Sequence, residues 1–364
     1  MAVEHHRDGT ARDRRLADHR LAAAELALLG DDELAARVAA AGVTGTGIGG
    51  VTTGLTVAGA RVFVKRIPLT EPELLPEHVR STANLFDLPP HCQYGVASPG
   101  FGAWRELRAN LMTTAAVVAG GSEAFPMLHH WRVLSGPPPA GYIRPEVDEE
   151  VAFWGGSPQV RRRLKALASA PASLVLFVEH VPHQLGEWLA GPVAAGGDEL
   201  AAACRMLERG LLDAVAGLQA AGLHHFDGHL GNLLTDGERV YLGDLGLAVS
   251  ERFDLSAAER EFLERNATHD AAYARMTLVN WLVRWVVGVA VPAEGGPVER
   301  NAHVRRYAAG ERPQGVSAEV ADMIVRHAPV AAVLNDFYWA LFAGEITTPY
   351  PAERIEALLA PSTS

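Results

Sequence analysis

The chain has 364 residues, of which 48% are apolar and 21% are charged, and its formal net charge is −11. A chain of this length can bury a large core and is expected to form two domains or lobes. The negative charge argues against a general nucleic-acid-binding protein, because such a protein neutralises phosphates with a basic face. Two cysteines, Cys92 and Cys204, are too few for a disulfide framework, and we interpret both as small buried residues.

No targeting or membrane-spanning segment is recognisable in the sequence. Residues 1–20 are polar and charged and lack the apolar stretch of a secretory signal. The most apolar window, 278–291, has 14 residues, including Asn280 and Arg284, and is shorter than the roughly 20 residues that a membrane span requires. We therefore expect a cytoplasmic protein that has neither a membrane nor a nucleic acid as its partner.

The first part of the chain changes from a helical to a β-rich pattern. Residues 1–43 predict a helical extension, whose role the pattern does not indicate. The glycine-rich segment 44–50 predicts a turn. The β-rich runs 51–57 and 61–65, which a short turn with one glycine separates, predict a hairpin. Residues 67–103 hold several prolines and glycines and are expected to be irregular.

A helix, a strand, a second helix and a second strand are predicted next. Apolar residues recur at helical spacing over 104–118, and strand patterns follow at 130–134 and 173–181. Between these strands, Ser157 and Pro158 are typical of the start of a helix. Its basic residues are expected to form a solvent-exposed face: Arg161, Arg162, Arg163 and Lys165.

From residue 182 onward the pattern is helical. Asp198 is expected to cap a long helix that ends at Gly222. Further helices are predicted at 257–266, 268–290, 317–327 and 330–343. Strands first and helices later indicate an α+β fold. The predicted divisions are a helical extension over 1–43, a β-rich N-terminal lobe over 44–181 and a helical C-terminal lobe over 182–364.

The strongest functional signal lies in residues 224–246. This segment combines a histidine, two aspartates, an asparagine and a glycine in a set order: His225-x-Asp227, Asn232 and Asp244-x-Gly246. Phosphoryl transfer from ATP needs one carboxylate to orient the attacking hydroxyl. It also needs oxygen ligands, such as an amide and a second carboxylate, that hold Mg²⁺ against the phosphates. The segment supplies all of these groups.

Two short β-rich runs within this segment predict how those groups meet. The runs 232–234 and 240–242 flank Asp236-Gly237, which is a strong hairpin-turn signal. A hairpin with this turn would bring Asn232 and Asp244 close together at its two open ends.

This segment resembles the catalytic and metal-binding loops of the protein-kinase-like superfamily, which includes aminoglycoside phosphotransferases and choline kinases. The resemblance implies a bilobal protein-kinase-like fold and the use of ATP and Mg²⁺. It implies that Asp227 orients or deprotonates the acceptor hydroxyl and that His225 braces the loop. It further implies that Asn232 and Asp244 are ligands of Mg²⁺.

The segment also departs from the family pattern. Leu245 stands where the family has an aromatic residue. His229 stands two residues after Asp227, where serine/threonine protein kinases usually carry a lysine, and we include it among the candidate catalytic residues. Together with Gly231 it is more similar to the small-molecule phosphotransferases, whereas Leu247-Ala248 is more similar to the protein kinases.

A second, weaker motif precedes the first predicted hairpin. Gly45, Gly47 and Gly50 match G-x-G-x-x-G, and Lys65 follows on the second strand of the hairpin. Because a hairpin rather than a helix follows, the context resembles the phosphate-covering loop and strand lysine of kinases. Glycine has no Cβ, so backbone amides at these positions can approach phosphates closely.

Lys65 requires an acidic partner to orient its ammonium group toward phosphates. We select Glu106, on the helix predicted at 104–118, and keep Glu73 and Glu77 as alternatives. Asp270, at the start of a predicted helix, is expected to cap that helix and could also brace the catalytic loop.

The end of the strand predicted at 173–181 resembles the entry to the hinge between two kinase lobes. The resemblance implies that backbone groups of Glu179 and Val181 bind the edge of adenine.

These observations predict an ATP- and Mg²⁺-dependent phosphotransferase. No Ala-Pro-Glu tripeptide follows Gly246, so the peptide-docking segment of protein kinases is not recognisable, and a small hydroxylated molecule is slightly favoured as the acceptor. A serine/threonine protein or peptide kinase is the first alternative. A catalytically silent pseudokinase that acts as a binding module is the second. The oligomeric state is left open.

Overall fold

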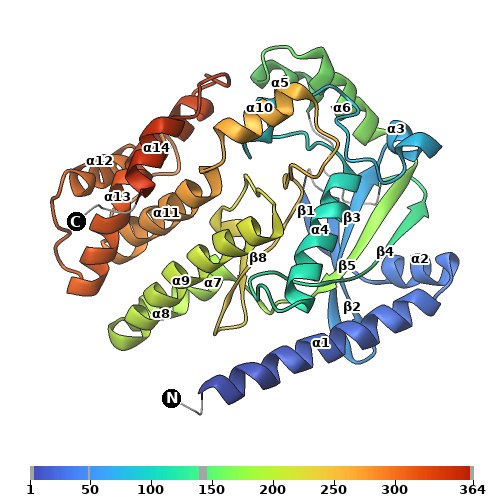
Figure 1. Ribbon diagram of the computed structural model, residues 1–364, viewed down its shortest axis with the longest axis horizontal. Helices are drawn as coiled ribbons and strands as arrows, with labels where there is room; N and C mark the ends of the chain where they lie inside the picture. The colour runs from blue at the N-terminus through green and yellow to red at the C-terminus, as the bar shows by residue number, and fades with distance from the viewer. Residues whose placement is uncertain (1–3, 48–49, 139–145, 361–364) are drawn as a thin grey trace.

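The computed structural model describes residues 4–47, 50–138 and 146–360, and its architecture is α+β (Figure 1). The first half of the chain forms a five-stranded antiparallel sheet, and the second half is mainly helical. A second sheet of three short strands lies within the helical part. The α+β class predicted from the sequence is therefore confirmed.

The large sheet has the strand order β1-β2-β3-β5-β4, and each neighbouring pair is antiparallel. Its strands are β1 Val43–Gly47, β2 Gly50–Val57, β3 Ala60–Leu69, β4 Leu128–Ser135 and β5 Ala172–Glu179. The hairpin predicted from the runs 51–57 and 61–65 is β2–β3, and Val57 pairs with Ala60 across its turn.

The prediction that residues 44–50 form only a turn is wrong. Residues 43–47 pair with β2 as strand β1, and Gly47 pairs with Gly50. Threonines alternate with glycines here, and a β-branched residue at every second position favours an extended chain. Residues 48 and 49 lie outside the described residues.

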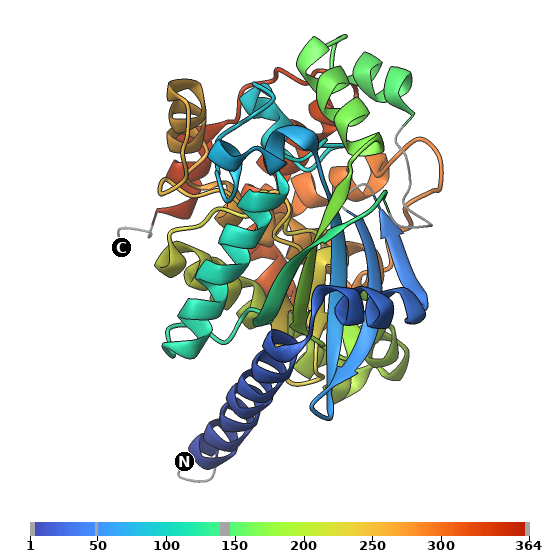
Figure 2. The same cartoon turned by 90° about the vertical axis from the view of Figure 1, so that its right-hand side faces the viewer.

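Helices cover both faces of the large sheet. Alternation along β3 divides its side chains between the two faces. On one face Val64 packs with Leu26, in a cluster formed with α1 and α2, and Figure 2 shows α2 crossing the strands. On the other face Ile67 packs with Trp104 of α4. Lys65 therefore lies on the α4 side. The three helices are α1 Glu4–Leu28, α2 Asp31–Ala40 and α4 Ala103–Val118.

The connection between β3 and α4 is largely irregular, as predicted. It holds only short helical turns: α3 Glu71–Leu74, η1 Pro76–His78 and η2 Pro90–Gln93. Two helices pack against it through an apolar cluster that includes Phe86, Phe101, Trp154 and Leu164. These helices are α5 Val147–Phe153 and α6 Pro158–Ala168.

Helix α6 begins where the sequence indicates, since the Ser157 side chain accepts a hydrogen bond from the backbone N–H of Val160. The prediction that all of its basic residues are exposed is wrong for Arg163. This guanidinium is buried on the face of α6 that packs on the connection, and it lies 3.0 Å from the buried carboxylate of Glu73.

The helical part is built around three long helices, α9 Gly197–Ala221, α11 His269–Trp281 and α13 Ala318–Phe342. Shorter elements complete it: β6 His183–Gln184, α7 Leu185–Trp188, α8 Ala190–Ala195, η3 Leu230–Asn232, β7 Leu233–Thr235, β8 Val240–Leu242, α10 Ala257–Arg265, α12 Val298–Ala308 and α14 Ala352–Leu359. Residues Leu282–Val286 continue α11 as a single π-helical stretch. None of the described helices is long and apolar enough to cross a membrane.

Three predicted helix boundaries need correction. Helix α9 starts at Gly197 after a Gly196 cap, so Asp198 lies in its first turn and does not cap it, although its end at the left-handed Gly222 is as predicted. The helices expected at 317–327 and 330–343 are one helix, α13, which contains Pro329. Burial of the residues around this proline offsets the backbone hydrogen bond that it removes. The helix expected at 268–290 is α-helical only to Trp281.

Candidate functional site

The small hairpin β7–β8 brings the positions of Asn232 and Asp244 together, as the sequence predicts. Leu233 pairs with Leu242, and beyond this pair the backbone N–H of Gly243 donates to the carbonyl of Asn232 at 2.9 Å. At the turn, Asp236 Oδ1 accepts two backbone N–H bonds and Gly237 has a φ of 94°. The open ends of the hairpin therefore hold Asn232 and, one residue beyond Gly243, Asp244.

The loop that carries Asp227 is held by buried polar contacts. Asp270 accepts the backbone N–H groups of His225 and Phe226 at 2.8 and 2.9 Å. The cap of α11 is Thr268 rather than Asp270, so the bracing role weighed for Asp270 agrees with the geometry and the capping role does not. These bonds hold Phe226 in a left-handed conformation, with a φ of 64°. Such a conformation is unfavourable for an aromatic residue unless its surroundings impose it.

His225 links this loop to the hairpin. Its Nδ1 accepts the backbone N–H of Asp227 at 3.2 Å, and its Nε2 lies 2.9 Å from the carbonyl of Gly243. Since Nδ1 accepts, Nε2 carries the proton and donates to this carbonyl. The side chain thus fixes the distance between the loop and the strand that leads to Asp244.

The Asp227 carboxylate is part of a small polar cluster. The Asn232 amide nitrogen donates to the carbonyl of Asp227 at 2.8 Å and to its Oδ2 at 3.1 Å. Both bonds use the nitrogen, so the amide oxygen is the atom that a cation would contact. Burial raises the pKa of Asp227 to about 6. His229 Nε2 lies 3.7 Å from Asp227 Oδ1, and burial lowers the pKa of this imidazole.

Lys65 joins two carboxylates from distant parts of the chain. Its Nζ lies 2.8 Å from Glu106 on α4 and 2.8 Å from Asp244 after β8. Although burial alone would raise it, the charge of Lys65 lowers the pKa of Asp244 to about 2. Burial raises the pKa of Glu106. Glu106 was the selected partner of Lys65, and of the alternatives Glu73 is paired with Arg163 while Glu77 is exposed.

Two cavities meet at these side chains. The first, of about 630 Å³, lies between the large sheet and the β7–β8 hairpin; its walls include Val178, Leu242 and Asn232. The second, of about 260 Å³, is lined by Asp227 and by residues 95, 97–100, 102 and 103. Lys65, Glu106 and Asp244 line both. The charged cluster therefore stands at the boundary between a larger and a smaller compartment.

The three predicted phosphate-binding glycines lie in β1 and at the start of β2. A Cβ on Gly45 would lie 2.7 Å from Thr52 Oγ1, and one on Gly50 would overlap the carbonyl of Arg66. Gly50 also has a φ of 132°. Close strand packing thus accounts for two of the three glycines without any ligand, which the motif alone does not reveal.

Glu179 and Val181, for which the resemblance implies a role at a hinge, both line the first cavity. The backbone N–H of Glu179, however, donates to the carbonyl of Met127 at 2.8 Å. The backbone N–H of Glu179 is therefore not available to a ligand.

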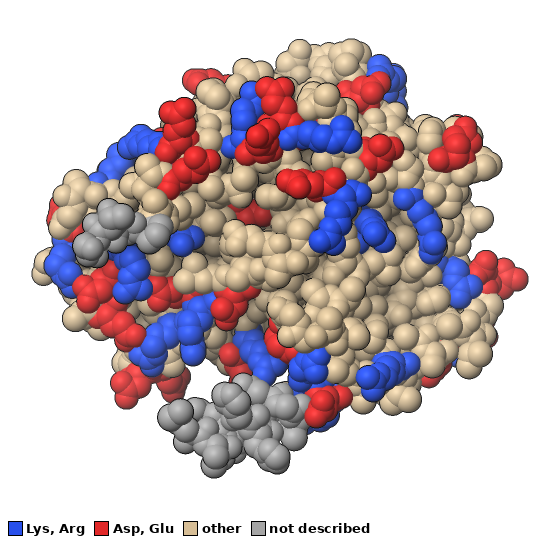
Figure 3. Space-filling model, viewed as in Figure 1, with Lys and Arg blue, Asp and Glu red and all other residues tan. Residues whose placement is uncertain are grey.

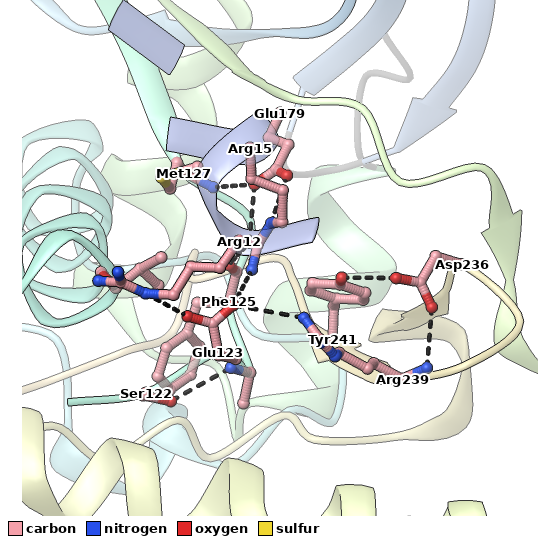
Figure 4. A network of polar contacts seen from close by, with 12 residues as sticks. Arg12, Arg15, Ser122, Glu123, Phe125, Met127, Glu179, Asp236, Arg239 and Tyr241 are labelled. Atoms are coloured by element: carbon pink, nitrogen blue, oxygen red, sulfur yellow. Dashed lines mark hydrogen bonds and ion pairs between the residues drawn. The ribbon is translucent and has the colours of Figure 1, made fainter. Parts of the chain in front are cut away.

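Sequence reasoning missed the ion network behind this position. Figure 4 shows Arg15 of α1 between the carboxylates of Glu179 and Glu123. Arg15 donates to both oxygens of Glu179, at 2.7 and 2.9 Å, and its Cζ lies 5.0 Å from the centre of the Tyr241 ring. No local pattern in residues 1–43 identifies these partners, which are more than 100 residues away.

The surface charge is mixed on the face seen in Figure 3, where acidic and basic side chains of the described residues lie side by side. Among the described residues, no group of three or more His, Cys, Asp and Glu side chains is placed to share a metal ion. A comparison of the chain with protein-family models and with curated proteins found no match.

Proposed function

We propose that this chain is an ATP- and Mg²⁺-dependent phosphotransferase with a bilobal protein-kinase-like fold. The observation that carries the proposal is the convergence of Lys65, Glu106 and Asp244 at the boundary of two cavities. Asp227 lines one of these cavities and Asn232 lines the other. The β1–β5 sheet with α4 would be the N-terminal lobe and the helical part the C-terminal lobe. As an ATP-dependent enzyme it is expected to act in the cytoplasm.

The first cavity fits a nucleotide by size and by lining. Its volume of about 630 Å³ lies within the range of roughly 300–1,000 Å³ for small-molecule sites. Apolar side chains such as Leu176, Val178 and Leu242 suit a base, and Lys65 at one end suits phosphates.

The donor set also fits Mg²⁺. This ion prefers oxygen ligands and is usually held by one or two carboxylates together with substrate phosphates, so it needs no cluster of three acidic or histidine side chains. Asp244, whose pKa is about 2, is ionised at neutral pH. Asp244 and the amide oxygen of Asn232 would hold the ion, and the ion would neutralise phosphate charge.

Within this proposal each side chain has a separate task. Asp227 would accept the hydrogen bond of the acceptor hydroxyl and take its proton. Glu106 would hold Lys65 in place once the metal takes over Asp244. His225 and Asp270 would position the loop without touching either substrate. Positioning and charge neutralisation would supply most of the rate acceleration.

A small hydroxylated molecule is the slightly favoured acceptor. A serine/threonine protein or peptide kinase and a catalytically silent binding module are the alternatives. The silent module would bind the nucleotide but would not consume it.

Variants of the two aspartates test the proposal. In Asp244→Ala we expect the thermal stabilisation by ATP to lose its dependence on Mg²⁺, because the metal ligand is gone. In Asp227→Asn we expect binding of MgATP to persist while turnover falls by about 10²–10⁴, because the base is lost. Asp322→Asn, an exposed aspartate of α13, is the matched control.

Calorimetry measures the thermal stabilisation by ATP and the binding of MgATP. An ATP-consumption assay with a panel of alcohols and peptides measures turnover. Near wild-type turnover in Asp244→Ala would refute the assignment. Binding of MgATP without consumption by the wild-type protein would favour the silent module.

A further inference from the structure

The irregular connection between β3 and α4 is fixed to the helical part of the molecule. Tyr94 Oη donates to Asn266 Oδ1 at 2.8 Å, and the Gln93 amide nitrogen donates to the carbonyl of Leu247. Earlier in the same connection, Thr82 Oγ1 accepts the backbone N–H of Asp254 at 2.8 Å. Tyr94 and Val96 also belong to the apolar core of the helical part. Residues 93–102 therefore form a wall that is anchored to the helical part.

This wall touches the candidate base. A Cβ on Gly95 would overlap Asp227 Oδ1 and would lie 2.8 Å from its Cγ. Gly95 is not among the positive-φ residues, so its backbone conformation does not require glycine. Glycine is required at position 95 because the Asp227 carboxylate leaves no space for a Cβ.

The wall lines the second cavity, which is small. The cavity of about 260 Å³ is smaller than the roughly 300–1,000 Å³ of sites for drug-sized ligands. Its lining includes residues 95, 97–100 and 102, together with Asp227. A small molecule fits the size of this cavity, in which Gly95 of the wall stands beside the Asp227 carboxylate.

The charges that line the second cavity disfavour an anionic occupant. Its two cationic side chains, Lys65 and Arg163, are each already paired with carboxylates. The Asp227 carboxylate lines the same cavity, and among the described residues no lysine or arginine is paired with it; the His229 imidazole, whose pKa burial lowers, lies 3.7 Å away. An acceptor that carries a carboxylate or phosphate would meet this charge, and a neutral or cationic one would not.

We propose that residues 93–102 form the acceptor pocket, that this pocket takes a small neutral or cationic alcohol, and that Gly95 is the residue that sets the position of Asp227. This inference rests on the proposed phosphotransferase function. It goes further by naming the acceptor class and the segment that selects it.

The pocket itself can be tested without turnover. Ser98 lines it and is half-buried, and the native thiols of Cys92 and Cys204 are buried, so Ser98→Cys adds one reactive thiol. We expect a small cationic methanethiosulfonate reagent to modify this thiol at least tenfold faster than an anionic reagent of similar size. A bulky polyethylene-glycol maleimide is expected to react slowly.

The wild-type protein and Ser169→Cys, at an exposed site, serve as controls, and the exposed thiol should react with all three reagents. Equal rates for the two small reagents at Ser98→Cys, or fast reaction with the bulky one, would overturn the pocket. Because this measurement needs no nucleotide, it decides the pocket even if MgATP does not bind and the proposed function fails.

The role of Gly95 is tested by Gly95→Ala. The added methyl must displace the Asp227 carboxylate, and a displacement of about 1 Å can lower a rate by about 10². We expect consumption of MgATP with ethanolamine or glycerol as the acceptor to fall by about this factor, while the affinity for MgATP stays unchanged.

Gly191→Ala, on α8 with open space at its Cβ, is the control variant and should behave like the wild type. Unchanged turnover in Gly95→Ala would remove Gly95 from the proposal. Faster phosphorylation of glycolate or of a serine/threonine peptide library than of the two small alcohols would overturn the acceptor class.

Discussion

At the scale of single residues, the candidate site holds a carboxylate in surroundings that do not favour its charge. Asp227 is largely buried, with a side chain that is 21% exposed, and its partners are the neutral Asn232 amide and an imidazole whose pKa burial lowers. Burial disfavours the charged form of an acid, which raises the pKa of Asp227 to about 6. A base with a pKa near neutrality is efficient in proton transfer, so the same burial that costs stability would serve catalysis.

Burial of the Asp227 charge lowers the stability of the protein. We therefore expect the Asp227→Asn variant to be more stable than the wild type, in a pH-dependent way. The ordinary pKa of the group is 3.8 and its folded-state pKa is about 6. Between these values the folded state keeps a proton that the unfolded state has lost, so stability falls as the pH rises and the loss is complete above pH 6. The asparagine variant lacks this loss, so its advantage should grow from near zero at pH 4 to at most about 3 kcal/mol at pH 7.5.

Urea unfolding of both proteins at these two pH values measures the effect. A difference in unfolding free energy that is the same at both values would contradict the buried charge as its cause.

At the scale of elements, α1 supports a wall of the first cavity although it is remote in sequence from the other residues of that wall. Arg15 connects three parts: Glu179 at the end of β5, Glu123 before β4 and the ring of Tyr241 in β8. Glu123 in turn lies 3.4 Å from Arg239. The helix thus ties the large sheet to the small hairpin behind the first cavity.

We therefore expect Arg15→Ala to weaken the binding of MgATP. The paired fork of Arg15 fixes the Glu179 side chain, whose other contact is the backbone N–H of Met127, so its loss frees the strand end that lines the cavity. Calorimetry should show a dissociation constant raised by about three- to tenfold, which corresponds to roughly 1 kcal/mol.

Arg15→Lys should recover only part of this loss, because an ammonium cannot reproduce the paired fork. Arg20→Ala, an exposed residue of the same helix, is the control. Equal affinities for the Arg15→Ala and Arg20→Ala variants would exclude a role of α1 at the cavity.

At the scale of the whole molecule, buried ion pairs join the sheet part to the helical part. Arg105 of α4 is 2% exposed and lies 2.7 Å from Glu259 of α10. The same guanidinium donates to the carbonyl of Thr82 in the β3–α4 connection. The Arg105 guanidinium therefore joins α4, the β3–α4 connection and the helical part. Removal of the Glu259 carboxylate would leave this buried positive charge without compensation.

Glu259→Gln should consequently lower the unfolding free energy by about 3 kcal/mol. The amide retains an oxygen for the capping bond to the backbone N–H of Ser256, so the loss reports mainly on Arg105. Glu261→Gln in the same helix is the matched control. Its pair with Arg265 is about two-thirds exposed, and such pairs contribute about 0–1 kcal/mol.

Urea unfolding measures the unfolding free energies of the Glu259→Gln and Glu261→Gln variants. Equal effects of the Glu259→Gln and Glu261→Gln variants would show that the buried pair does not tie the two parts together.

The elements that agree with the sequence are those that interactions between near neighbours in the chain specify. The β2–β3 and β7–β8 hairpins and the α4 helix agree with the sequence, because turn residues and hydrophobic periods act over a few residues. The pairing of Lys65 with Glu106 could be proposed from the helical position of the acid, while the sequence left Glu73 and Glu77 as alternatives. Glu73 was excluded only by its burial against Arg163, which sequence periodicity had placed in solvent.

The errors share one cause, which is tertiary packing that outweighs local preference. Residues 317–327 and 330–343 were expected to form two helices, yet the buried residues around Pro329 keep α13 continuous. Residues 44–47 were expected to turn, yet β2 holds them in the sheet. The register of Gly45 opposite Thr52 shows that glycine there relieves a steric conflict between strands.

By itself the sequence determined the α+β class, the two hairpins and the order of His225, Asp227, Asn232 and Asp244, because these depend on spacing along the chain. Only the tertiary structure decided that α1 supports the first cavity and that Gly95 lies against Asp227. Contacts of this kind join residues more than 100 positions apart, and no local pattern specifies them. Burial of apolar surface is the dominant favourable contribution to folding. The polar partners therefore meet where the packing of apolar surfaces elsewhere in the chain brings them together.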